Sequence, residues 1–181
     1  MKMKDMKDKT PAFHVLIEVT KLLNRLKIPY SLDGGTLLGF YREGWFFDHD
    51  SDIDITLLDK NPELDIIKDK VKKLGFYVAL FKKIGSSGSK KLGIKKSKIY
   101  VDIISKVEKD GYALWSIRKD PKPIKRVPVK FYKKLGTLEI RGHKFSVPED
   151  TEGYLETRYG KTWRTPIIDW DRKKGDLAYK I

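Results

Sequence analysis

The strongest constraint in this sequence is a run from Asp52 to Leu57 in which acidic or polar residues alternate with aliphatic ones. On a β-strand, successive side chains point to opposite faces, so Asp52, Asp54 and Thr56 share one face while the aliphatic residues enter a core. Two carboxylates at this spacing lie about 6.5–7 Å apart at their Cα atoms, and both reach one pair of divalent cations. Without a cation they would repel each other beside an apolar core. The pattern alone leaves two interpretations open, a metal site or an acidic loop that runs into an amphipathic edge strand.

A further acid, Asp102, interrupts an aliphatic run from Ser97 to Ile104 that also predicts a strand. An unpaired carboxylate in such a strand is costly. If this strand lies beside the strand of residues 52–58, Asp102 completes a three-carboxylate site. If the strand lies at the edge of the sheet, Asp102 faces solvent instead. Asp50, just before the alternating run, is a candidate to support the ligands or the substrate.

Two glycines, Gly34 and Gly35, separate a short predicted strand at 30–33 from a helical run. Glycines let the backbone approach a ligand closely, and the free N–H groups at the start of a helix favour a phosphate. Thr36 adds a hydroxyl donor, and Arg42, one to two turns further on, offers a planar fork of donors that suits a phosphate. The alternatives are a plain turn for the glycines and a surface position for Arg42.

Composition limits the class of protein. The chain has 181 residues and a formal net charge of +14, which suits one domain with a substantial core and favours anionic partners: nucleotides, nucleic acid, phosphorylated glycans or an anionic membrane surface. A lysine-rich solvated surface gives the same excess. Cysteine is absent, which excludes disulfides and fits a reducing cytoplasm. No apolar window approaches the roughly 20 residues of a membrane span and no signal peptide is evident, so we expect a cytoplasmic protein without a transmembrane segment.

The remaining patterns predict an α+β chain. Helices are expected at 11–27, capped by Thr10, at 62–74 and from 148 to 158. Strands are expected at 76–81, 91–96 and 112–117, with a hairpin at 138–147 and a proline-punctuated connection from 120 to 128. We expect a basic N-terminal tail at 1–10, one domain at 11–166 and a C-terminal tail at 167–181. The aromatic residues 45–47 form a pocket wall or fill the core.

Three segments match, in order, the motifs of one family. Gly34 to Arg42 (GGTLLGFYR) resembles the G-x-L-L-G-x-x-R segment of the LicD and fukutin-type phosphotransferases, within the nucleotidyltransferase superfamily that has the DNA polymerase beta-like fold. Asp48 to Ile55 (DHDSDIDI) resembles the family's W-D-D-D-I-D-I block, although Phe47-Asp48-His49 replaces its usual Pro-Trp-Asp entry. Val147 to Pro166 resembles its C-terminal V-P…Y-L-x-x-R-Y-G…P segment. The matches span residues 31–166, but the chain lacks the cysteines with which some eukaryotic members bind zinc.

This resemblance implies a nucleotidyltransferase fold, a mixed β-sheet flanked by helices with a β-rich C-terminal extension, in which residues 11–166 form the catalytic domain. It implies that Asp52, Asp54 and Asp102 hold two Mg²⁺ or Mn²⁺ ions about 3.5–4 Å apart, and that Asp102 takes the acceptor's proton. Gly34, Gly35 and Thr36 would cradle the donor phosphate and Arg42 would offset its charge. The implied donor is a CDP-linked alcohol, such as CDP-choline or CDP-ribitol, and the acceptor is a glycan or another hydroxyl compound. CMP would leave.

Two other functions stay open at this point. A nucleotidyltransferase that moves a nucleoside monophosphate from an NTP to a small molecule, protein or RNA uses the same three acids and releases pyrophosphate. A non-catalytic nucleotide- or nucleic-acid-binding protein fits the net charge of +14. Such a binder has no need of the third acid, so the presence of Asp52, Asp54 and Asp102 together favours an enzyme.

Overall fold

A five-stranded mixed sheet forms the centre of the computed structural model, which describes residues 3–57, 64–83, 87–116, 124–167 and 175–179. Its strand order is β1 (Tyr30–Leu32), β2 (Ile53–Leu57), β5 (Ile99–Ser105), β4 (Lys90–Lys96) and β3 (Tyr77–Lys83). β2 and β5 are parallel, and the other neighbouring pairs are antiparallel. The two strands predicted to carry carboxylates therefore lie side by side at the middle of the sheet, which confirms the arrangement that a three-acid site requires.

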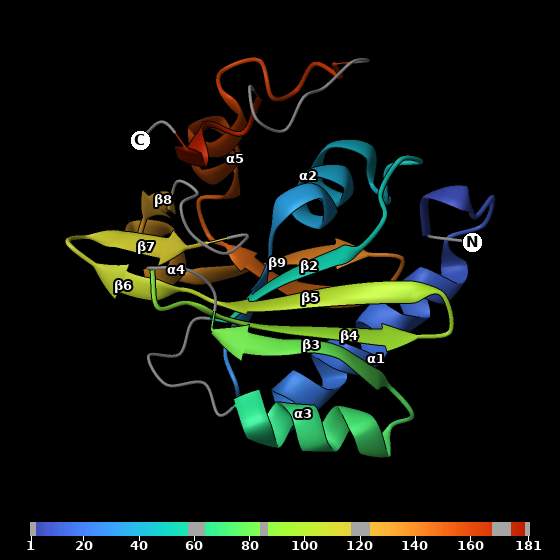
Figure 1. The fold of residues 1–181 in the computed structure, drawn as a ribbon. Coiled ribbons are helices and arrows are strands. Elements are labelled where there is room, and N and C mark those ends of the chain that lie inside the picture. The colour runs from blue at the N-terminus through green and yellow to red at the C-terminus, as the bar shows by residue number, and fades with distance from the viewer. Residues whose placement is uncertain (1–2, 58–63, 84–86, 117–123, 168–174, 180–181) are drawn as a thin grey trace.

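The alternation of side chains decides which face of the sheet is apolar. Ile53, Ile55 and Leu57 of β2 are buried, as are the residues of the same parity on β5. The helices α1 (Thr10–Arg25) and α3 (Leu64–Lys73) pack against the apolar face, and α2 (Gly34–Glu43) lies on the other side (Figure 1). The acids of β2 and β5 point to the side that carries α2. The predicted segregation of acids and aliphatic residues is confirmed.

Two smaller sheets form the β-rich extension. β9 (Leu135–Ile140) and β10 (His143–Pro148) form a hairpin that turns at Arg141 and Gly142, both with positive φ, as expected. β6 (Val107–Lys109), β7 (Tyr112–Trp115) and β8 (Lys125–Pro128) form a three-stranded sheet, and the short helix α4 (Lys130–Lys133) follows it. The proline-punctuated connection predicted at 120–128 is therefore wrong for its last four residues, because they pair with β7; residues 117–123 lie outside the described residues.

The helix ends depart from the predicted signals at two places. The helix expected from residue 148 begins only at Thr151, because Pro148 pairs with Leu135 as the last residue of β10. α5 (Thr151–Tyr159) begins at Asp150, whose side chain accepts from the Gly153 N–H, and ends at Gly160. The expected cap at Thr10 is wrong: Thr10 is the first residue of α1, and its N–H donates to Asp8 Oδ1 at 2.8 Å. Asp8 supplies the acceptor instead, since its carboxylate reaches the helix start two residues ahead. The predicted start of α3 at Asn61-Pro62 lies outside the described residues.

Both ends of the described chain contact the domain. Met3, in the 3-10 helix η1 (Met3–Asp5), is buried, and Lys9 Nζ donates to Asp48 O at 2.9 Å. At the other end, the 3-10 helix η2 (Leu177–Tyr179) lies against α5 and β8, and Asp176 before it is buried. Within the described ranges, no helix combines the length and apolar character that a bilayer span requires.

Candidate metal and phosphate site

Asp52, Asp54 and Asp102 come together where β2 and β5 begin to pair. Asp54 and Asp102 are direct partners in the parallel register, and Asp52 directly precedes β2. One carboxylate oxygen from each residue lies within 4.8 Å of the other two. Carboxylate oxygens are the ligands that Mg²⁺ and Mn²⁺ prefer, so this cluster has the donor set of a divalent cation site.

The charges of these acids oppose one another. Burial, followed by the charges of Asp52 and Asp102, raises the pKa of Asp54 well above its usual value. Burial also raises the pKa of Asp102, although the ammonium of Lys91 partly offsets this effect. Burial of the charged carboxylates and their mutual repulsion both cost free energy. A divalent cation between the acids would reduce both costs, because it supplies the positive charge that these partly desolvated carboxylates lack.

The two oxygens of the Asp102 carboxylate have different surroundings. Lys91 Nζ, from the neighbouring strand β4, donates to Asp102 Oδ2. Asp102 Oδ1 is buried and has no hydrogen-bond partner among the described residues. A buried carboxylate oxygen without a donor is costly, so Oδ1 is an observation in favour of a ligand at this position.

The start of α2 lies against the same acids. A Cβ atom added to Gly34 would come within 2.2 Å of Asp54 Oδ2, and one added to Gly35 would come within 2.9 Å of Asp50 Oδ1. Asp50 Oδ2 accepts from the Phe47 N–H at 3.3 Å. Burial and the charge of Asp52 raise the pKa of Asp50 to about 7, although the Phe47 N–H works against them. The glycines thus let two carboxylates approach the helix start, where the sequence predicted a phosphate.

Thr36 and Arg42 make contacts with protein groups around the site. Thr36 is fully buried, and its Oγ1 accepts from the Asp54 N–H at 3.0 Å. The predicted contact of Thr36 with a phosphate is therefore corrected: its hydroxyl fixes β2 against α2. Arg42 lies at the cavity wall, where its Nη1 donates to Trp163 O at 2.9 Å and its guanidinium carbon lies 4.8 Å from the centre of the Phe47 ring. Phe46 is buried in the core, whereas Phe47 lines the cavity.

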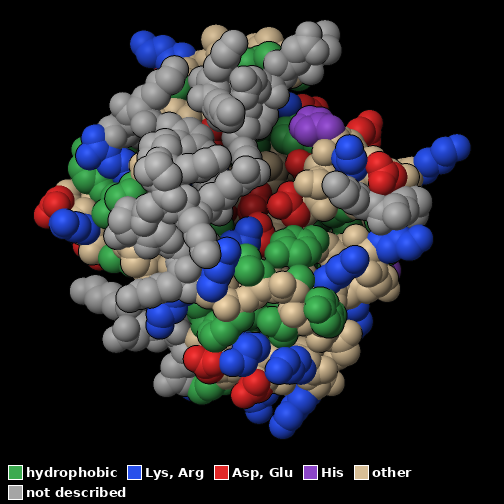
Figure 2. Space-filling view, viewed as in Figure 1, with side chains coloured by type: hydrophobic (Ala, Val, Ile, Leu, Met, Phe, Trp, Pro, Cys, Tyr) green, Lys and Arg blue, Asp and Glu red, His purple; other side chains and the backbone are tan. Residues whose placement is uncertain are grey.

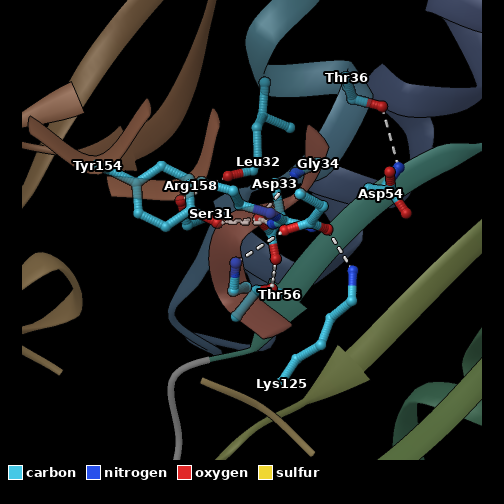
Figure 3. A network of polar contacts seen from close by, with 12 residues as sticks. Ser31, Leu32, Asp33, Gly34, Thr36, Asp54, Thr56, Lys125, Tyr154 and Arg158 are labelled. Carbon is cyan, nitrogen blue, oxygen red and sulfur yellow. Dashed lines mark hydrogen bonds and ion pairs between the residues drawn. The ribbon is translucent and has the colours of Figure 1, made fainter. Parts of the chain in front are cut away.

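Asp33, which the sequence analysis did not select, is the centre of a buried polar network beside this site (Figure 3). Its Oδ1 accepts from the Gly34 N–H, from Tyr154 and from Arg158, and its Oδ2 accepts from Thr56 at 2.5 Å and Lys106 at 2.6 Å. Burial alone would raise the pKa of Asp33, but the charges of Lys106 and Arg158 hold it well below its usual value. Burial in turn lowers the pKa of Lys106 to about 8, against the opposing charge of Asp33.

The network continues to the C-terminal segment. Arg158 Nη2 lies 3.4 Å from Asp176 Oδ2, which also accepts from the buried Lys125 Nζ. Arg158 and Tyr154 belong to the C-terminal motif seen in the sequence, so that motif was the available signal for this network. It joins α5 to the start of α2 through Asp33.

A cavity of about 490 Å³ contains the three acids. Figure 2 shows red acidic side chains in a hollow near the centre of the face in view, with blue Lys and Arg side chains around the molecule. The walls come from α2, the 47–52 loop, β4, β5 and the segment after α5. The sequence-predicted residues that line it are Gly34, Gly35, Arg42, Asp50, Asp52, Asp54 and Asp102.

The mixed sheet and its flanking helices form a nucleotidyltransferase fold, and the site that this fold carries is a cluster of three carboxylates. Two solved structures share this fold. One is the crystal structure of ANT(2″)-Ia in complex with adenylyl-2″-tobramycin, with a TM-score of 0.52 and 15% identity over 94% of this chain and 87% of that one. The other is the solution structure of the antibiotic-resistance factor ANT(2″)-Ia, with a TM-score of 0.54 and 16% identity over 96% and 83%. At this identity the likeness establishes the fold alone.

The family follows from the sequence match. The model of the LicD/FKTN/FKRP nucleotidyltransferase domain matches residues 27–150, so the chain belongs to this family. It is 32% identical to ribitol-5-phosphate transferase FKTN of Macaca fascicularis, over 85% of this chain and 33% of that protein. The Homo sapiens protein of the same name is 31% identical over the same shares. The chain thus spans about a third of the length of these relatives.

Proposed function

We propose that this protein is a metal-dependent transferase that moves a phosphorylated alcohol from a CDP-linked donor to a hydroxyl group of a glycan or a similar acceptor. The observation that carries the proposal is the meeting of the Asp52, Asp54 and Asp102 carboxylates, within 4.8 Å of one another, in a cavity beside the start of α2. Membership of a family that includes ribitol-5-phosphate transferases supports ribitol 5-phosphate as the group that is moved.

The residues present fit a divalent metal. The buried Asp102 Oδ1 has no donor among the described residues, and the mutual repulsion of the acids favours a cation between them. Asp52, Asp54 and Asp102 would hold Mg²⁺ or Mn²⁺, with two ions as the resemblance implies. Bound metal would supply Lewis-acid stabilisation of the donor's diphosphate and lower the pKa of the acceptor hydroxyl.

The protein's own groups bind and orient the substrates. The acceptor oxygen attacks the phosphorus that carries the alcohol. The bond from this phosphorus to the oxygen that bridges the two phosphorus atoms breaks, and CMP leaves with the bridging oxygen as part of its own phosphate. Gly34 and Gly35 let the Asp54 and Asp50 carboxylates lie against the start of α2, and the N-terminal dipole of this helix favours the leaving phosphate in the adjoining cavity. Arg42, on the cavity wall, offsets its negative charge. Asp102 is the carboxylate that takes the acceptor's proton, and Asp50 supports the three ligands from the α2 side.

Product analysis tests this function directly. The protein is incubated with Mg²⁺, a glycan acceptor and CDP-ribitol, CDP-glycerol, CDP-choline or CTP. We expect CMP release from at least one CDP-alcohol and none from CTP. Release of pyrophosphate from CTP or ATP, without CMP from any CDP-alcohol, would establish nucleotidyl transfer and reject our proposal.

Variants test the residues. Asp54→Asn and Asp102→Asn should lower the rate of CMP release by about 10³-fold or more, because each removes a charge at the developing transition state. Asp69→Asn, which removes an exposed aspartate of α3 away from the cavity, is the matched control and should match the wild type. Equal rates for all three variants would reject the site. Location in the cytoplasm and contact with an anionic membrane surface stay predictions from the sequence.

A further inference from the structure

Lys91 holds an unusual position in the site. It lies on β4, which pairs with β5, and its Nζ donates to Asp102 Oδ2 at the wall of the cavity. Lys91 follows a Gly/Ser turn flanked by lysine pairs, a composition that favours a solvated surface, yet its side chain is only 15% exposed. The ammonium therefore neutralises part of the negative charge on which a metal at these acids would depend.

The bond between Lys91 and Asp102 satisfies the site only in part. Three carboxylates meet one ammonium here, and Asp102 Oδ1 keeps no donor among the described residues. A lysine ammonium is a point charge on a flexible four-carbon stem, so it can leave one oxygen and reach another anion without a change of backbone. A divalent cation at the same acids would compete with it for Asp102, since both are held by the same negative charge.

The other cations on the cavity wall have partners outside the three acids. Arg158 contacts Asp33 and Asp176, and the Lys125 side chain, only 2% exposed, pairs with Asp176. Arg42 donates to the Trp163 carbonyl and to Glu43. Lys91 differs in that it pairs with Asp102, a proposed metal ligand.

We propose that Lys91 is an exchangeable counter-ion: it neutralises Asp102 in the metal-free protein, gives up Asp102 to the metal, and then binds the diphosphate of the nucleotide donor. This role rests on the proposed metal-dependent function. It makes Lys91 a donor-binding residue that the family motifs in this sequence do not include, and it couples metal binding to donor binding through one side chain.

The test separates two affinities that should move in opposite directions. Binding of Mn²⁺ alone, and of CDP in the presence of saturating Mn²⁺, is measured by calorimetry at pH 8 for the wild type and Lys91→Met. We expect Lys91→Met to bind Mn²⁺ several-fold more tightly, because a competing charge is gone, and CDP roughly tenfold more weakly, because a charge-assisted contact is gone. Lys91→Arg keeps the charge and should restore most of the CDP affinity.

Lys96→Met is the matched control. Lys96 lies on the same strand and pairs with a carboxylate, Glu18, but away from the three acids. The affinities of Lys96→Met for Mn²⁺ and for CDP should equal those of the wild type. Weaker Mn²⁺ binding by Lys91→Met would show that Lys91 supports the site rather than competes for it, and unchanged CDP binding would exclude the phosphate contact; either result overturns the inference. If the wild type binds no Mn²⁺ while CDP still binds, the metal site itself fails, and the exchange proposed for Lys91 fails with it.

Discussion

The Cα atom of Gly34 lies so close to the carboxylate of Asp54 that an added Cβ would come within 2.2 Å of Oδ2. Gly34 also has a φ of +57°, a conformation that side-chain-bearing residues rarely adopt. Both observations require glycine at the point where α2 begins. The Asp54 carboxylate of β2 and the start of α2 can therefore lie this close only because residue 34 has no side chain.

Gly34→Ala should lower both the stability and the activity of the protein, because it adds backbone strain and a clash with Asp54. We expect a loss of about 1–3 kcal/mol in the free energy of unfolding from the φ strain. We also expect a fall in CMP release of about 100-fold, because displacement of a ligand by on the order of 1 Å misplaces the reacting groups. Urea denaturation and the CMP assay measure the two effects.

Gly44→Ala is the matched control for this variant. Gly44 ends the same helix with a φ of +69°, but an added Cβ would meet nothing within 4 Å. It should show the loss of stability and keep the activity. A similar loss of activity in both alanine variants would mean that strain, and not the contact with Asp54, controls the site.

Thr36→Val tests the hydrogen bond that fixes β2 against α2. The substitution keeps the shape of the side chain but leaves the Asp54 N–H without its acceptor, Thr36 Oγ1. An unpaired buried N–H costs about 1–3 kcal/mol, and we expect this loss in urea denaturation together with weaker Mn²⁺ binding. Thr20→Val is the control, since the Thr20 hydroxyl donates to the Leu16 and Ile17 carbonyls of its own helix. Equal stability of the two variants would contradict a positioning role for Thr36.

The residues that alternate along β2 could be predicted because burial of one face dictates a period of two. The sequence also identified Asp102, but the direct pairing of Asp54 with Asp102 depends on the register of two strands about 48 residues apart in the chain, which no local pattern encodes. Sequence reasoning missed Asp33 for a different reason. A single acid at the end of a short strand looks like an ordinary loop residue until Lys106 and Arg158, far away in the sequence, are placed beside it.

The place of Lys91 beside Asp102 could not be predicted from the sequence for the same reason. It stands in a lysine-rich hairpin, where charge and turn residues favour a solvated surface. Only the pairing of β4 with β5 brings it to Asp102. Long-range pairing, and not local composition, therefore decides which of the many lysines in this basic chain belongs to the site.

Asp33→Asn tests the buried network. The substitution keeps the size of the side chain but leaves Lys106 and Arg158 without the carboxylate that they share. Removal of one partner from a buried ion pair typically costs about 3–5 kcal/mol, and we expect a loss of this size in urea denaturation at pH 7 without metal. Glu139→Gln removes an exposed carboxylate of β9 and should cost less than about 0.5 kcal/mol. A loss below about 1 kcal/mol for Asp33→Asn would show that the network contributes little to stability.

The difference in the free energy of unfolding between the wild type and Asp33→Asn should depend on pH, which provides a separate check on Asp33. Its folded-state pKa lies below the usual value of 3.8 because of Lys106 and Arg158, which outweigh the effect of burial. The unfolded state therefore takes up a proton at a higher pH than the folded state, so the stabilisation from Asp33 is complete above about pH 5 and is lost as the pH falls. We expect the wild type and Asp33→Asn to converge below about pH 4, by at most about 1.4 kcal/mol per pH unit, while Glu139→Gln runs parallel to the wild type. Denaturation series between pH 7 and pH 3 measure the gap; a constant gap would mean that Asp33 is not held ionised by its two cations.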